Sequence, residues 1–180
     1  MQRITATARL FAKHRRIPAI ILCLTVVGAV ATVGAQELKK NEQGKYIDKN
    51  GNPTYRIASD GTVDWFTYSG YRRYGANCMT CHGPDGEGSS YAPSLVEAMK
   101  NLTYQQFQDV VINGKKDVGT GTANIVMPAF GVNPNVMCYL DDIYVYLRAR
   151  ADGKLPRGRP EKFEPKSKEA DAAENACMGS

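Results

Sequence analysis

The chain has 180 residues, which is enough for one modest domain with additional segments at its ends. It contains 23 lysine and arginine residues against 18 aspartate and glutamate residues. Residues 1–35 hold five of these basic residues and no acidic one, so the remainder carries 18 of each sign. The net charge of +5 therefore comes from this leader, and it gives no support for nucleic-acid binding.

The leader has the pattern of a secretory signal peptide. Its basic start is followed by an apolar run from Ile17 to about Val33, which ends in small residues at Gly34 and Ala35. A retained membrane anchor is the alternative. The run is barely long enough to span a bilayer and contains proline and glycine, which favours cleavage after Ala35. We expect export to the periplasm and no membrane association of the cleaved chain.

Residues 36–63 form a polar, turn-rich extension. Asn50 and Gly51 form a favoured turn pair between two short segments, 46–48 and 54–57. The sequence therefore predicts a short, marginal hairpin in this extension.

Three main helices are predicted after the extension. Aromatic residues recur near helical spacing over residues 64–75. A second helix is predicted over 103–112, where Thr103 and Gln106 form a capping-box pair. A third, over 135–151, is expected to be capped by its first residue, an asparagine.

The composition changes after Pro156, where charged residues, proline and alanine dominate. Such a segment buries little apolar surface to offset its ordering entropy, so residues 154–180 are predicted to be a polar tail. The tail either lies on the domain or is loose in solvent. The fold class expected for residues 64–153 is a single all-α domain with long loops between its helices.

The strongest motif is C-x-x-C-H, formed by Cys78, Cys81 and His82. In this pattern the two thiols bond covalently to a haem and the histidine binds its iron. A zinc site would need a second, closely spaced ligand pair, and a thioredoxin-like pair would need a preceding strand. A chance occurrence is the remaining alternative. Haem attachment is favoured, and the single motif predicts one haem, which would also fill a small core.

The second iron ligand must come from elsewhere, because the only other histidine, His14, lies in the leader. A methionine thioether suits low-spin haem iron. Met127 is favoured because Pro128 keeps its backbone extended, as in a loop that presents one side chain. Met137 is second, since it falls in a helix where packing is its ordinary role. The three methionines set aside are Met79 between the cysteines, Met99 near a helix on the histidine side, and Met178 in the tail.

Together these features resemble the class I cytochrome c family over residues 64–151. The matching segments are residues 75–88 around the motif, 92–95, 127–130 and 141–148. The resemblance implies an all-α fold around one covalent haem c.

A closer resemblance is to the four-cysteine c-type cytochromes of methanol metabolism, on the basis of residues 71–77 and an extra cysteine pair. It implies a quinoprotein methanol or alcohol dehydrogenase as electron donor, lanthanide-dependent in some members. Another cytochrome c or a terminal oxidase would be the acceptor.

The extra pair is Cys138 and Cys177, the two cysteines left after the leader and the haem motif are assigned. A disulfide between them would hold the tail against the domain and would protect a thiol in an oxidising compartment. The alternative is a buried Cys138 with an intermolecular or modified Cys177.

The expected function is one-electron transfer rather than enzymatic catalysis. Two alternatives remain: a haem subunit of a stable oxidoreductase complex, and a haem enzyme with an open sixth position. Residues 77–147 carry seven acidic and three basic residues. This excess either steers a basic partner or is simply a solvated face.

Overall fold

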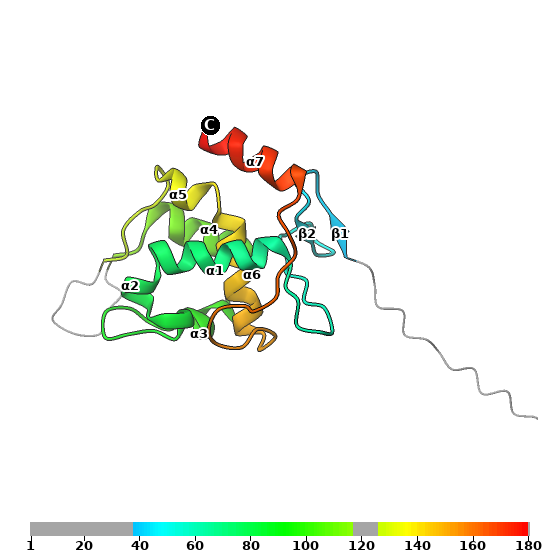
Figure 1. The fold of residues 1–180 in the computed structure, drawn as a ribbon. Coiled ribbons are helices and arrows are strands. Elements are labelled where there is room, and N and C mark those ends of the chain that lie inside the picture. Colours follow the sequence, from blue (N-terminus) through cyan, green and yellow to red (C-terminus); the bar gives the residue numbers. More distant parts are fainter. Residues whose placement is uncertain (1–37, 117–125, 180) are drawn as a thin grey trace, which may run out of the picture. The chain divides into compact units, whose positions relative to one another are not determined.

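The computed structural model describes residues 38–116 and 126–179 (Figure 1). The predicted signal peptide, residues 1–35, lies outside this range. In the described part of the chain, no helix is long and apolar enough to cross a membrane.

The described residues are mainly helical, which confirms the predicted all-α class. The two short strands, which form an antiparallel pair, are β1 (Lys39–Lys40) and β2 (Tyr46–Ile47). The helices are α1 (Trp65–Asn77), α2 (Met79–His82), the 3-10 turn η1 (Pro84–Gly86), α3 (Leu95–Met99), α4 (Tyr104–Asn113), α5 (Pro134–Met137), α6 (Leu140–Ala151) and α7 (Lys168–Met178).

Helices α1 and α6 pack against each other and form the centre of the core (Figure 1). Helix α1 begins after Asp64, whose carboxylate accepts the backbone N–H of Thr67 at 3.0 Å. The two helices meet at Gly70, where a Cβ atom would lie 1.8 Å from the backbone oxygen of Asp142. Only glycine permits this close approach, and it brings the buried Tyr74 and Tyr146 within ring contact.

The capping box of α4 is present as predicted. Thr103 accepts the backbone N–H of Gln106, and the Gln106 side chain accepts the backbone N–H of Thr103.

The prediction of one continuous helix over residues 135–151 is wrong, because the structure has two helices there, α5 and α6. Asn133 caps α5 and Pro134 occupies its first turn, so the helix begins two residues earlier than expected. The backbone then leaves the helical conformation at Tyr139, before α6 starts. Asn135 lies inside α5 and caps nothing.

The predicted hairpin in the extension is present but short. The backbone N–H of Thr54 donates to Tyr46 at 2.9 Å, and Ile47 forms an isolated antiparallel bridge with Pro53. Gly51 has a φ of +82°, as the turn requires.

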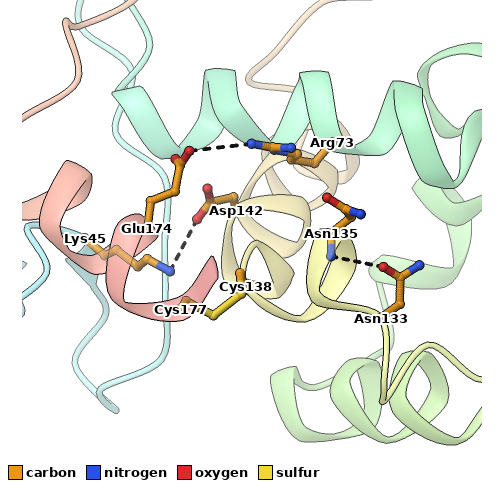
Figure 2. Close-up of a disulfide and its surroundings, with 8 residues drawn as sticks. All are labelled: Lys45, Arg73, Asn133, Asn135, Cys138, Asp142, Glu174 and Cys177. Atoms are coloured by element: carbon orange, nitrogen blue, oxygen red, sulfur yellow. Dashed lines mark hydrogen bonds and ion pairs between the residues drawn. A yellow bond between two sulfur atoms is a disulfide. The ribbon is translucent and has the colours of Figure 1, made fainter. Parts of the chain in front are cut away.

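The tail lies on the domain and contains a helix that the composition did not predict. Phe163 stacks on Tyr68 of α1, with ring centroids 3.7 Å apart. Helix α7 is then linked to the end of α5 by the disulfide between Cys138 and Cys177, which confirms the predicted pairing (Figure 2).

The acidic residues of the 77–147 segment bind the flanking segments. The ion pairs are Lys45 with Asp141 and Asp142, Arg150 with Glu87, Arg157 with Asp85, and, within the segment, Lys100 with Glu97. Among the described acids of this segment, Asp109 forms no ion pair with another described residue. Most of the described acidic side chains in residues 77–147 are therefore paired with basic side chains of the same molecule.

Candidate haem site

A cavity of about 720 Å³ lies beside the C-x-x-C-H motif, in the size range of cofactor sites. Its wall includes Cys78, Cys81, His82 and Met127, so the structure brings together the four residues assigned to the haem from sequence. Apolar side chains from α3, α4, α5, α6 and the α3–α4 connection form much of the remaining wall, among them Leu95, Leu102, Phe107, Val136, Ile143 and Leu147.

The motif forms a helical turn at the end of α1. The backbone N–H of Cys78 donates to Tyr74 at 2.9 Å, and that of His82 donates to Cys78 at 2.9 Å. This turn sets the two cysteines and the histidine along one wall. Neither Cys78 nor Cys81 takes part in a disulfide, so both sulfur atoms are available for bonds to a haem.

The imidazole of His82 is buried and fixed by one hydrogen bond. Its Nδ1 lies 2.9 Å from the backbone oxygen of Pro93. A carbonyl oxygen only accepts, so Nδ1 carries the proton and Nε2 keeps its lone pair. That tautomer is the one that binds a metal through Nε2, with the Nδ1 bond orienting the ring.

The loop after His82 closes tightly on itself. Gly83 has a φ of +72°, and a Cβ atom there would lie 2.1 Å from the backbone oxygen of Gly88. Gly88 in turn donates its N–H to the backbone oxygen of His82 at 2.8 Å. The glycines of this loop therefore permit a compact turn directly behind the histidine.

Met127 is held on the cavity wall by its backbone. Its N–H donates to Lys115 at 2.8 Å and its carbonyl accepts from Lys115 at 3.0 Å, forming an antiparallel bridge. Met137 does not line this cavity but a second one of about 180 Å³, beside the disulfide. The structure thus separates the two methionines that the sequence left as first and second candidates.

Met99 is a further candidate for the second iron ligand, although the sequence places it on the histidine side of the haem. It is fully buried in α3, a helix near the motif as expected, but its side chain lines the same cavity as His82. Among the described residues, Met127 and Met99 are the two thioethers on this wall.

The site fits a haem. A flat apolar group matches the apolar wall, the two cysteines outside the disulfide lie one helical turn apart, and the Nδ1 hydrogen bond of the buried imidazole leaves Nε2 to bind iron. The zinc alternative lacks donors, because Cys138 and Cys177 are joined to each other. Within the described ranges, no three histidine, cysteine or carboxylate side chains gather to hold a metal ion.

Sequence reasoning missed the partners that fix the ligands. The Pro93 carbonyl and the Lys115 backbone are main-chain groups, and no side-chain motif marks a main-chain contact. From the sequence, Pro93 belongs to the segment 92–95 that matches the cytochrome c family, and nothing in that match marks its carbonyl as the partner of His82.

Known proteins resemble this chain over the part that contains the motif and the cavity. The family described as "Cytochrome C oxidase, cbb3-type, subunit III" matches residues 67–147. Cytochrome c-553I of Paracoccus denitrificans is 56% identical over 137 residues, covering 76% of this chain and 60% of the relative. The chain thus spans well under two thirds of that relative's length.

Two further proteins are similar over most of their own length. Cytochrome c-555 of Methylococcus capsulatus (strain ATCC 33009 / NCIMB 11132 / Bath) is 40% identical over 106 residues, covering 58% of this chain and 79% of the relative. The crystal structure of the c-type cytochrome XoxG from Methylobacterium extorquens AM1 superposes with a TM-score of 0.71 and 53% identity, covering 78% of this chain and 85% of that one. With its apolar cavity and attachment motif, the chain belongs to the cytochrome c family and carries a covalently bound haem c.

Proposed function

We propose that the chain is a one-electron carrier whose single haem is bonded to Cys78 and Cys81 and ligated by His82 and Met127. The observation that supports this most strongly is the cavity wall on which all four side chains lie. The haem supplies a reversible one-electron change at iron, and thioether ligation favours the ferrous form.

The chain's own residues support transfer rather than catalysis. Apolar side chains form most of the cavity wall, and the hydrogen bond at Nδ1 orients His82 so that Nε2 can bind the iron. The chain's other histidine, His14, lies in the predicted signal peptide, so no distal imidazole is available for acid–base work.

We further propose a periplasmic location, following cleavage after Ala35, and a quinoprotein methanol or alcohol dehydrogenase as donor. The similarity to cytochromes c-553I, c-555 and XoxG supports this partner, as does the second cysteine pair. Another cytochrome c or a terminal oxidase is the proposed acceptor.

Reduction by a purified quinoprotein methanol dehydrogenase tests the donor. A quinol gives up two electrons, so two equivalents of cytochrome should be reduced per methanol oxidised. The rate should saturate with cytochrome concentration. It should depend only weakly on salt, because the acids of the 77–147 segment are mostly paired within the molecule.

A control uses class I cytochromes c that lack the second cysteine pair, under the same conditions. No reduction of this protein, or equal reduction of those cytochromes, would remove the donor assignment. A steep fall of the rate with increasing salt would show that unpaired charges steer the two proteins together. It would contradict the expected weak salt dependence but not the donor assignment.

One observation favours a second candidate, a haem subunit of a stable complex: the matching family is described as an oxidase subunit. Gel filtration of the same mixture separates the two, because a carrier elutes apart from its donor and a fixed subunit elutes with it.

A further inference from the structure

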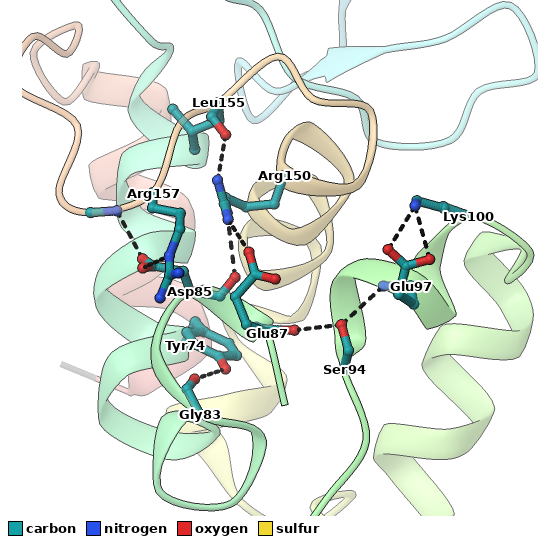
Figure 3. Close-up of polar contacts among 12 residues, drawn as sticks. Tyr74, Gly83, Asp85, Glu87, Ser94, Glu97, Lys100, Arg150, Leu155 and Arg157 are labelled. Atoms are coloured by element: carbon teal, nitrogen blue, oxygen red, sulfur yellow. Dashed lines mark hydrogen bonds and ion pairs between the residues drawn. The ribbon is translucent and has the colours of Figure 1, made fainter. Parts of the chain in front are cut away.

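The loop of residues 83–88, which we name the post-histidine loop, is fastened to both central helices (Figure 3). From α1, the buried Tyr74 donates its hydroxyl to the backbone oxygen of Gly83 at 2.5 Å. From α6, Arg150 reaches the other end of the loop. No motif in the sequence marks either contact.

Arg150 makes three polar contacts at once, although its side chain is only 6% exposed. Its guanidinium donates to the backbone oxygen of Asp85 at 3.3 Å, to the backbone oxygen of Leu155 at 2.6 Å and to the carboxylate of Glu87 at 2.6 Å. The rigid fork of donors suits such a set of acceptors, and a lysine ammonium does not reproduce it. A buried arginine therefore joins α6, the post-histidine loop and the start of the tail.

The post-histidine loop is in turn connected to His82 by two routes, one to its backbone and one to its imidazole ring. Gly88 donates its N–H to the backbone oxygen of His82 at 2.8 Å. On the other route, Ser94 donates its hydroxyl to the backbone oxygen of Gly86 at 3.2 Å, and the preceding Pro93 accepts the His82 Nδ1–H. A shift of the loop would therefore move the acceptor that orients the ring.

We propose that Arg150 and Tyr74 are positioning residues that fix the orientation of the His82 ring through the post-histidine loop. The inference rests on the proposed function, in which His82 is an iron ligand. Partners outside the ligand set commonly fix the tautomer and orientation of a ligating histidine. Here the loop transmits that constraint from the helix pair α1 and α6, which forms the centre of the core.

The test compares three variants of the holoprotein. Arg150→Lys keeps the positive charge but loses the planar set of guanidinium N–H donors. Tyr74→Phe removes one hydroxyl without opening a large cavity. Arg157→Met is the matched control: this arginine also contacts the loop, at the Asp85 carboxylate, but its side chain is 66% exposed. Exposed ion pairs contribute little.

Two NMR readouts report on the ring itself. In the ferrous protein, exchange of the His82 Nδ1–H with solvent, measured relative to backbone amides of α6, should accelerate about tenfold or more in Arg150→Lys and Tyr74→Phe. In the ferric protein, the pattern of haem methyl shifts, which depends on the orientation of the axial ligands, should change in the same two variants. Arg157→Met should match the wild type in both.

Unchanged exchange and unchanged haem methyl shifts in both test variants would overturn the inference, and so would an equal change in Arg157→Met. Tyr74→Phe decides the matter if Arg150→Lys fails to fold. Failure of the proposed function is recognised separately, because the wild-type protein would then lack a low-spin haem with a His82 Nδ1–H signal.

Discussion

Replacing Met127 by alanine should leave the haem covalently bound but open one coordination position at its iron. Thioether ligation favours the ferrous form, so its loss should lower the reduction potential by on the order of 0.1 V, a fraction of the ~0.8 V range that axial ligands set. The ferric variant should also lose the weak near-infrared band of methionine-ligated haem. Redox titration and absorption spectroscopy of the purified holoprotein measure both effects.

Two other methionines serve as controls for this ligand assignment. Met137→Ala should keep the potential and the band, because Met137 lines the cavity beside the disulfide. Met99→Leu should also keep both, since leucine preserves most of the buried volume. If the Met99 or Met137 variant loses the near-infrared band while Met127→Ala keeps it, Met127 is not the ligand.

Removing the disulfide with Cys138→Ser and Cys177→Ser together should lower the free energy of unfolding substantially. The two cysteines are separated by 39 positions in the sequence. A closed loop of that length corresponds to about 4 kcal/mol in the chain-entropy model, and measured losses are typically about 2–4 kcal/mol. Denaturant unfolding of the oxidised holoprotein measures the loss.

The haem spectrum of this double variant should match the wild type, because the bridge lines the second cavity and not the haem site. Ala176→Ser, an exposed substitution on the same helix, is the control and should unfold like the wild type. Alkylation of the unreduced wild-type protein should modify no cysteine of the exported chain. Two alkylated thiols would contradict the pairing.

Most features predicted correctly from the sequence are set by neighbouring residues; the disulfide between Cys138 and Cys177, 39 positions apart, is the long-range exception because few cysteines were left to pair. The C-x-x-C-H motif forms a single helical turn, and the capping box of α4 joins residues three positions apart. The turn at Gly51 is equally local. Such signals are readable because their physical cause lies within a few positions of chain.

The features missed depend on residues far apart in the chain. Composition leaves the tail either on the domain or loose in solvent, and it does not predict helix α7. This helix is held by the predicted disulfide and by an ion pair in which the Glu174 carboxylate lies 3.9 Å from the Arg73 guanidinium of α1 (Figure 2). A local signal did exist, since Ser167 caps α7 and two acids follow in its first turn. Composition misses α7 because it takes account neither of this cap nor of the domain surface on which the helix lies.

The acidic excess of residues 77–147 illustrates the same limit. A count of charges leaves a steering surface and a solvated face as alternatives, but Lys45 and Arg157 come from segments on either side and neutralise several of the acids. Asp142 is nearly inaccessible to solvent, and burial raises its pKa to about 6 although Lys45 acts in the opposite direction. Sequence counts cannot distinguish such internal pairs from charges available to a partner.

The most direct test of the central claim, that this protein is an electron carrier with a closed iron, is carbon monoxide titration of the ferrous wild-type holoprotein. With His82 and Met127 both bound, the visible haem bands should stay unchanged at saturating carbon monoxide. Stoichiometric carbon monoxide binding to the wild-type protein would contradict the account, because it would show an open sixth position of the kind that a haem enzyme requires.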